Sequence, residues 1–485
     1  MQEISIKKAA VITACSKYIN IFLGVFFSAI LSRILTPNDY GIVAIVTVFT
    51  SFFIVLSNCG LGIAVIQKKE FSQNDINSIF TFSFYFAIFL MLTFIALAYP
   101  ICLFFNDKVY LPICIILSIS IFFNTLNAVP DGLLRKEKKF FLIGLRLVIV
   151  SILTYGATIV LALLKFKYYA LVVQSVISSI LIFLWNLKNS KVALVKKINW
   201  NVLKSIFSYS GYNFLFNFFN YFSRNLDKII IGKSLGNEDL AQYNKAYHFM
   251  LYPVQNLTNV ITPALHPILS DYQNDIKTVY EKYLKIVKLL SLLGVLVTGI
   301  CFICSKEIIT ILYGNQWTAS IVCFQFMSLS IWVQMIGGTS GALFAALNDT
   351  KRHFYVTIIN TLIVIVALAF GAWQRSIQKI SFYVTIALNL HFFINYYALI
   401  SQTMKGDFIS FLKNLVPDFV ILAGLCFLII PITHFIVIKN ILLSFIVKAL
   451  LITFVYMVFM TLFKQWKYYI PLLPAKFKSR FIKEY

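Results

Sequence analysis

The sequence alternates between long apolar runs and short polar stretches over its 485 residues. An apolar run of about 20 residues can cross a bilayer as a helix. The pattern predicts fourteen such helices, with approximate bounds 10–34, 40–66, 78–105, 109–131, 141–164, 168–187, 205–232, 240–268, 280–304, 318–346, 354–374, 378–402, 412–438 and 441–463. The connecting segments are too short to fold on their own. The predicted fold class is therefore an all-α polytopic membrane protein.

Basic residues in the connecting segments predict the orientation of these helices. The segments on the side of the N-terminus carry 26 lysines and arginines, whereas those on the other side carry 9. Cytoplasmic loops of membrane proteins are enriched in these residues. We therefore expect both termini to be cytoplasmic. The longest internal segment on that side, 188–204, carries five lysines near the middle of the chain.

The helix predicted over 205–232 carries a polar ladder. Its members recur at spacings of 4, 3, 4 and 3, which places them on one helix face: Asn213, Asn217, Asn220, Arg224 and Asp227. A charge within hydrocarbon costs roughly 2.5–3.5 kcal/mol on insertion scales, so Arg224 and Asp227 must face protein or water. Two interpretations stay open. They form an ion pair that packs the helix against a neighbour, or they line a cavity in which Arg224 grips an anionic substrate.

Two further helices carry ladders. The 10–34 run contains Lys17 and Asn20 on one face, and the 240–268 run contains Lys245, His248, Tyr252, Gln255 and His266. The second run also contains three prolines, at which a helix can bend. Ladders on three helices predict a shared polar cavity. Its candidate substrate-binding residues are Lys17, Asn20, Asn213, Asn217, Asn220, Arg224, Asp227, Lys245, Tyr252 and Gln255, and its candidates for ion coupling are Asp227, His248 and His266.

Other polar residues within the apolar runs have less specific interpretations. Asn124, Asn127 and Asp131 form a short ladder that serves either interhelical hydrogen bonding or cavity lining. Arg146 and Lys288 lie near predicted cytoplasmic helix ends, where we expect them to anchor the chain at the membrane interface. The pattern assigns no role to Lys448.

A faint internal repeat predicts the domain organisation. Residues 32–43, SRILTPNDYGIV, align with residues 232–243, GKSLGNEDLAQY, at an offset of 200. Two related lobes of six helices with further helices appended are a common transporter plan. The predicted parts are an N-terminal lobe (1–187), a basic linker (188–204), a C-terminal lobe (205–404), helices 13 and 14 (405–463) and a basic cytoplasmic tail (464–485).

Composition and missing motifs exclude several classes of protein. With 60% hydrophobic and 12% charged residues, the chain cannot cover a soluble surface of its size. The net charge of +24 follows the topology pattern, so we do not expect nucleic acid as a partner. The eight cysteines lie almost all within apolar runs and are interpreted as small apolar residues rather than as zinc ligands or disulfide partners. No Walker loop, HExxH or GxSxG motif and no acid pair in a plausible catalytic loop is present, so we do not expect this chain to hydrolyse ATP as its energy source. We expect no enzyme and no cofactor, with H⁺ or Na⁺ as candidate coupling ions.

Four stretches of the chain resemble a known family. They are FSRNLDKIIIGKSLGNEDLAQYNKAY, YPVQNLTNVITPALHPILS, LSRILTPNDYGIVAIV and GLLRKEKKF. They are similar to the polysaccharide transport family of the MOP superfamily, the Wzx-type flippases of lipid-linked oligosaccharides. Arg224 and Asp227 match the RNxD pattern of that family, and Lys17 lies in the first helix, where relatives carry basic residues.

The resemblance implies a fold of two six-helix lobes in a V shape with two further helices, similar to lipid II flippases and multidrug antiporters. It implies translocation of an undecaprenyl-diphosphate-linked repeat unit across the bacterial cytoplasmic membrane, through a cationic central cavity, for O-antigen, capsule, exopolysaccharide or teichuronic acid synthesis. The expected partners are this substrate and the bilayer. The polysaccharide polymerase and chain-length machinery are further candidate partners.

Two other functions are weighed against this one. A cation-coupled multidrug antiporter on the same fold needs an acidic cavity, and the ladders offer only Asp227 and Asp131. A membrane polymerase or glycosyltransferase needs a catalytic acid or base, usually on a sizeable extramembrane loop, and no predicted outer loop is long. The cations of the ladders favour a diphosphate substrate.

Overall fold

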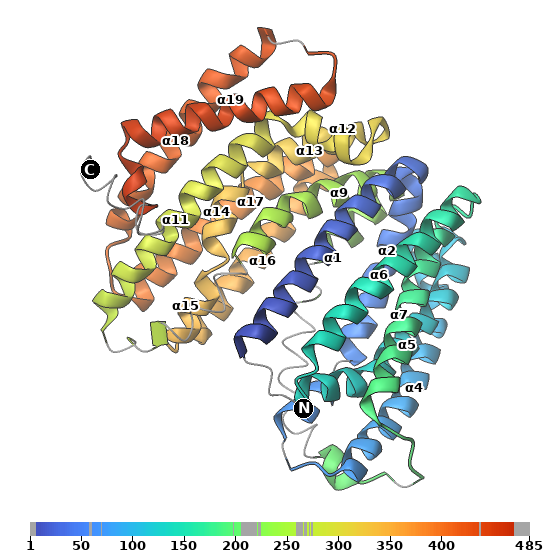
Figure 1. Cartoon of the computed structure of the whole chain (residues 1–485). Coiled ribbons are helices and arrows are strands. Elements are labelled where there is room, and N and C mark those ends of the chain that lie inside the picture. Colours follow the sequence, from blue (N-terminus) through green and yellow to red (C-terminus); the bar gives the residue numbers. More distant parts are fainter. Residues whose placement is uncertain are drawn as a thin grey trace. The chain divides into compact units, whose positions relative to one another are not determined.

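The computed structural model describes residues 6–57, 61–68, 70–196, 198–204, 221, 225–258, 265, 269–270, 272, 275–435 and 438–469. These residues form helices joined by short connections (Figure 1). The chain divides into two compact units, Met1–Ala241 and Gln242–Tyr485. This division lies further along the chain than the predicted linker. The lobe bounds proposed from the sequence remain a prediction.

The described helices at the start of the first unit are α1 (Ile6–Ile34), α2 (Pro37–Ser57), α3 (Leu61–Gln67), α4 (Gln73–Phe105), α5 (Tyr110–Lys136), α6 (Phe140–Leu163) and α7 (Tyr169–Ser190). Within it α5 packs against α2, α3, α4 and α7, while α1 packs on α6 (Figure 1). A buried apolar cluster joins α3, α4, α5 and α7, with Phe80, Val129 and Phe183 among its members.

The second unit contains most of α9 (Asn237–Pro253) and all later elements. These are α11 (Ile276–Ile303), α12 (Ser305–Tyr313), α13 (Thr318–Ser328), α14 (Ile331–Gly337), α15 (Ser340–Ala346), α16 (Thr350–Trp373), α17 (Ile377–Tyr397), α18 (Phe408–Phe435) and α19 (Ile441–Leu462), with short 3₁₀ turns at Asn315–Trp317 and Gln465–Tyr468. α16 pairs with α17, and α18 packs along α11 and α19 (Figure 1).

Polar caps define several helix ends. Ser72 and Asp75 form a capping box at the start of α4, and Asn106 ends that helix in the left-handed conformation at φ 56°. Asp275 accepts a hydrogen bond from the Thr278 main chain at the start of α11. The Thr278 hydroxyl and amide hold the pKa of the Asp275 carboxyl below its usual range. The short connections are therefore fixed by local chemistry.

Eleven helices of the described chain are long and apolar enough to cross a membrane, and one bent helix pair raises this number to up to twelve. All eleven coincide with predicted spans. Many of their apolar side chains are exposed, such as Phe454 on α19 at 69% and Phe427 on α18 at 81%. Apolar surface on so many long helices is expected where lipid replaces water. The molecule is a multi-pass membrane protein.

The predicted helix over 318–346 is not one straight span. It consists of Asn315–Ser328 and Ile331–Ala346, bent by 54°. At the break the main-chain N–H groups of Leu329 and Ser330 donate to the carbonyls of Phe326 and Met327, three residues back, so the chain makes a tightened turn there. The predicted spans 205–232 and 240–268 fall largely or partly outside the described residues. The total of fourteen and the location of the termini therefore stay predictions.

The described part of the 240–268 run changes its helix type at a proline, while the expected bend stays a prediction. α9 ends at Pro253, and the chain continues as a π-helix over Val254–Thr258. Proline lacks the N–H that an α-helix needs, so the hydrogen-bond pattern changes there. A second π-helical stretch, Ala398–Thr403, follows α17.

Candidate functional site

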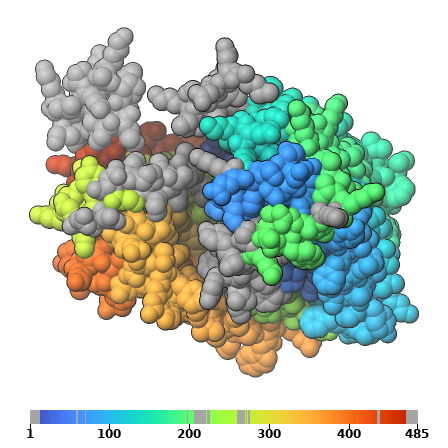
Figure 2. Space-filling model, turned by 90° about the horizontal axis from the view of Figure 1, so that it is seen from below, coloured from blue at the N-terminus to red at the C-terminus, as the bar shows by residue number. Residues whose placement is uncertain are grey.

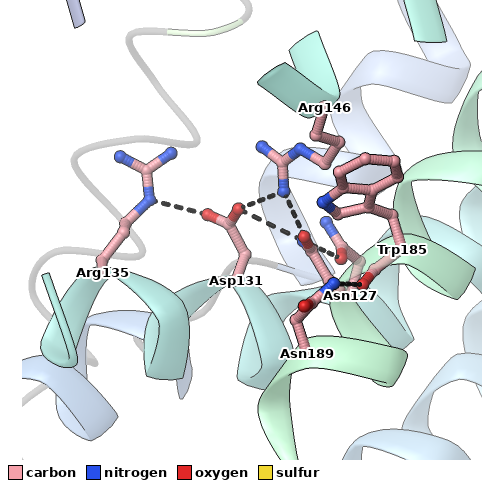
Figure 3. Close-up of polar contacts among 7 residues, drawn as sticks. Asn127, Asp131, Arg135, Arg146, Trp185 and Asn189 are labelled. Carbon is pink, nitrogen blue, oxygen red and sulfur yellow. Dashed lines mark hydrogen bonds and ion pairs between the residues drawn. The ribbon is translucent and has the colours of Figure 1, made fainter. Parts of the chain in front are cut away.

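A polar network joins three helices of the first unit (Figure 3). Asp131 on α5 lies between two arginines, with its carboxylate 2.7 Å from Arg135 Nε and 2.8 Å from Arg146 Nη1. Arg146 on α6 also donates to Asn186 Oδ1 at 2.6 Å, and Asn186 donates to Asn127 Oδ1 at 2.7 Å. Asn127 and Asp131 of the short ladder therefore provide interhelical hydrogen bonding, one of its two predicted roles, whereas Asn124 donates to Ser120 within α5.

The expected interface role of Arg146 is wrong. The side chain is buried at 8% exposure and its charge is matched by Asp131, whereas Arg135 on the other side of Asp131 is half exposed. Burying the guanidinium is tolerable because its Nη1 donates to a carboxylate and to an amide oxygen, although its Nε is buried with no hydrogen-bond partner among the described residues. The pattern of one helix could place Arg146 near an end but could not reveal partners on two other helices.

The candidate residues of α1 lie on a partly accessible face. Lys17 is exposed, and Asn20 is partly buried and accepts a hydrogen bond from the Ser151 hydroxyl of α6 at 2.6 Å. Asn20 therefore connects α1 to α6 within the first unit. Lys17 lies about one turn away and extends from the same helix.

The candidate residues of the 205–232 run are only partly described. Asn213, Asn217, Asn220 and Arg224 lie outside the described residues. Asp227 is buried at 7% exposure, and its carboxylate accepts a hydrogen bond from the main-chain N–H of Lys228 at 2.8 Å. The predicted pairing of Asp227 with Arg224 stays a prediction.

The candidate residues of α9 and its π-helical extension differ in their surroundings. The Lys245 ammonium lies over the rings of Tyr313 and Trp317, at 4.5 and 5.2 Å from their centroids. Both rings are buried, and such contacts stabilise a desolvated cation. His248 and Gln255 are exposed, Tyr252 is partly buried, and His266 lies outside the described residues.

The second unit contains a buried ion pair that the sequence pattern did not reveal. Lys288 on α11 donates to Asp418 Oδ1 on α18 at 2.6 Å, and the two side chains are only 2% and 0% exposed. Lys288 also donates to the Asn414 carbonyl, and Ser291 donates to the other Asp418 oxygen. Trp332 completes the network through its indole N–H on Ser291. The expected interface role of Lys288 is therefore wrong.

Lys448 also has a partner. Its ammonium contacts Glu307 Oε1 at 2.5 Å, and Ser444 donates to the same oxygen at 2.9 Å. The pair connects α12 to α19, as Lys288 and Asp418 connect α11 to α18. The signal in the sequence was the presence of lone charges within or beside apolar runs, which require partners.

Comparisons with known proteins fit this architecture. Residues 30–322 match the family described as polysaccharide biosynthesis protein. An uncharacterised membrane protein of the Klebsiella pneumoniae cps region is 25% identical over 84% of this chain and 85% of its own. The teichuronic acid biosynthesis protein TuaB of Bacillus subtilis is 20% identical, over 82% of each chain. The lipopolysaccharide biosynthesis protein WzxC of Escherichia coli is 19% identical, over 83% and 82%.

Solved structures share the fold. The lipid II flippase MurJ in an inward closed conformation has a TM-score of 0.73 at 16% identity, over 94% of this chain and 99% of its own. An inward-facing multidrug resistance transporter of the MATE family and MOP superfamily has a TM-score of 0.59 at 13% identity, over 84% and 95%. The family resemblance of the sequence motifs is confirmed, and the chain belongs to the polysaccharide biosynthesis protein family.

Proposed function

We propose that this protein is a flippase that moves an undecaprenyl-diphosphate-linked oligosaccharide repeat unit across the bacterial cytoplasmic membrane for surface polysaccharide synthesis. The observation that carries the proposal is similarity along more than four fifths of the chain to proteins named for teichuronic acid and lipopolysaccharide biosynthesis. The fold shared with a lipid II flippase supports it. We assign the chain as a transporter and not an enzyme.

The proposed architecture is two six-helix lobes in a V shape, with two further helices and cytoplasmic termini. The lobes alternate in exposing a cationic cavity to each side of the membrane. A diphosphate that crosses hydrocarbon needs compensating positive charge, because an unpaired anion there is costly. The proposed cations are Lys17, Arg224 and Lys245, with the asparagines of the 205–232 ladder, Asn20, Tyr252 and Gln255 as hydrogen-bonding groups for phosphate and sugar.

The described side chains refine this assignment. Lys17 is exposed and available to a ligand. The Lys245 ammonium is directed at Tyr313 and Trp317, so its participation requires the side chain to turn away from the rings. Asp227 serves as the partner of Arg224 or, with His248 and His266, as a group that couples transport to H⁺ or Na⁺. The polymerase and chain-length machinery of the pathway are the proposed protein partners.

A multidrug antiporter is the second candidate, and the shared MATE fold is its specific support. It needs carboxylates free to bind a cationic drug or its coupling ion. Asp131, one of the two candidates in the sequence, is held by two arginines. The geometry therefore favours the flippase.

The test is deletion of the gene followed by identification of the lipid-linked saccharides that accumulate. A flippase mutant should lose the surface polymer and accumulate one repeat unit on its lipid carrier at the cytoplasmic face, and the wild-type gene should reverse both effects. Normal polymer without accumulation would overturn the proposal. Altered drug sensitivity with normal polymer would favour the antiporter.

A further inference from the structure

Residues 191–204, which make up most of the basic linker (188–204), are hydrogen-bonded to the first unit. Residues 191–204 contain four lysines and no carboxylate. Their main chain is hydrogen-bonded to side chains at the start of α4, where Asn77, Thr81 and Ser78 accept from the N–H groups of residues 193, 195 and 199 at 3.1, 2.9 and 2.6 Å. The linker is therefore part of the surface of the first unit.

The linker has an inner and an outer face. Leu203 is buried in the apolar cluster of the first unit, with the partly buried residues Val192, Ile198 and Val202 packed beside it. The outer face is exposed and consists of Leu194 at 57%, Trp200 at 62%, Lys191, Lys196 and Lys204. In Figure 2 the green residues near position 200 lie at the surface, next to blue residues of the chain near position 70. The exposed face combines apolar groups with cations.

The level at which the linker contacts α4 indicates how deep its exposed face lies relative to the bilayer. The apolar part of α4 begins near Ser78, and its first strongly exposed aromatic residues are Tyr85 and Phe89. At 1.5 Å per residue, Ser78 lies about 10 Å from Tyr85 along the helix axis, toward the N-terminal end of α4. The linker is therefore level with the zone between hydrocarbon and water. Tryptophan is enriched in that zone, and clustered lysines attract anionic lipids there.

We propose that residues 191–196 and 198–204 form a membrane-surface contact that binds anionic lipid headgroups. Lys191, Lys196 and Lys204 contact lipid phosphates, while Trp200 and Leu194 insert between the headgroups. The absence of any carboxylate from residues 191–204 makes the charge of this face complementary to an anionic bilayer. The contact is independent of the transported substrate. It holds the ends of α4 and α7 at a fixed depth.

The experiment places the full-length protein in nanodiscs of phosphatidylglycerol or phosphatidylcholine that carry bromine on shallow acyl carbons. The signal of Trp200 is obtained as the difference in tryptophan quenching between wild type and Trp200→Phe. We expect clear quenching of Trp200 in phosphatidylglycerol and at least twofold less in phosphatidylcholine. The triple variant Lys191→Gln, Lys196→Gln, Lys204→Gln should show the same twofold loss in phosphatidylglycerol.

The matched control is Lys165→Gln with Lys167→Gln, at two exposed lysines in the α6–α7 connection. This variant should leave the Trp200 signal unchanged. Equal quenching of wild type and Trp200→Phe would overturn the lipid contact and assign the face to a protein partner. Equal Trp200 quenching in both lipids would overturn the role of the anionic headgroup. Thermal unfolding in detergent verifies that each variant is folded.

Discussion

Gly41 in the first turn of α2 lies directly against the main chain of Asn237 at the start of α9. A methyl group on Gly41 would stand 1.8 Å from the Asn237 carbonyl oxygen. Asn237 is held from another side by the Tyr110 hydroxyl, which donates to its side-chain oxygen at 2.7 Å. The two residues belong to the two segments that align at an offset of 200. The repeated segments therefore pack against each other, and glycine permits the approach.

Gly41→Ala should destabilise the protein, because the added methyl group collides with main-chain atoms that cannot rotate away. Overpacking of this kind costs about 1–3 kcal/mol or more. Thermal unfolding of the purified protein measures the effect. Gly156→Ala on α6 is the control, since a methyl group there meets nothing within 4 Å. Equal melting temperatures for the two variants would contradict the close packing.

Arg146→Met should destabilise the first unit strongly. It leaves Asp131 without its more buried partner and Asn186 without its donor. Removing one member of a buried ion pair costs about 3–5 kcal/mol. Arg135→Ala removes the half-exposed partner and should cost about 1 kcal/mol or less.

A double variant tests the cause of that loss. Asp131→Leu in the Arg146→Met background removes both charges, so it should be more stable than Arg146→Met alone. Urea or heat unfolding followed by helical circular dichroism gives the comparison. The alternative outcome is additivity, in which the double variant loses the sum of the unfolding free energies lost by Arg146→Met and by Asp131→Leu alone. That result would show that the two residues act independently.

Lys288→Met should loosen the contact between α11 and α18, because the Asp418 carboxylate then remains buried without a cation. The free energy of unfolding should fall by about 3–5 kcal/mol. The double variant Lys288→Met, Asp418→Leu should recover part of this loss. Fluorescence-detected size-exclusion after heating measures the fraction that stays folded. Lys413→Gln, at an exposed lysine of α18, is the matched control and should resemble wild type.

Under the proposed function, Arg224→Ala should abolish export of the repeat unit while the protein level in the membrane stays normal, because the diphosphate would lose the guanidinium proposed to bind it. Arg224→Lys keeps the charge without the planar fork and should give intermediate export. Surface polymer and accumulated lipid-linked saccharide are measured together in complemented deletion cells. Arg375→Ala, at an exposed arginine between α16 and α17, should be fully active. Wild-type polymer from Arg224→Ala would remove Arg224 from the mechanism.

The sequence revealed the spans but not the partners of their charges. Apolar length is a local property, so eleven described helices coincide with the predicted runs. The partners of Arg146 and Lys288 depend on tertiary packing. Because both residues lie near predicted helix ends, the sequence indicated that they reach the membrane interface, whereas the structure buries both in ion pairs. At the break before α14, the main-chain N–H groups of Leu329 and Ser330 donate to carbonyls three residues back, a tightened turn that the apolar pattern does not register.

The separation of Lys288 and Asp418 along the chain has a consequence during synthesis. The residues are 130 positions apart, so at about 5–20 residues per second α11 enters the bilayer roughly 7–26 s before its counter-ion is made. Arg146 follows Asp131 by only 15 positions and finds it almost at once. During that interval the Lys288 ammonium of the nascent chain has no Asp418 to pair with. A chain truncated before α18 would keep an ammonium without its counter-ion permanently, so we expect such a chain to be less stable than the full-length protein.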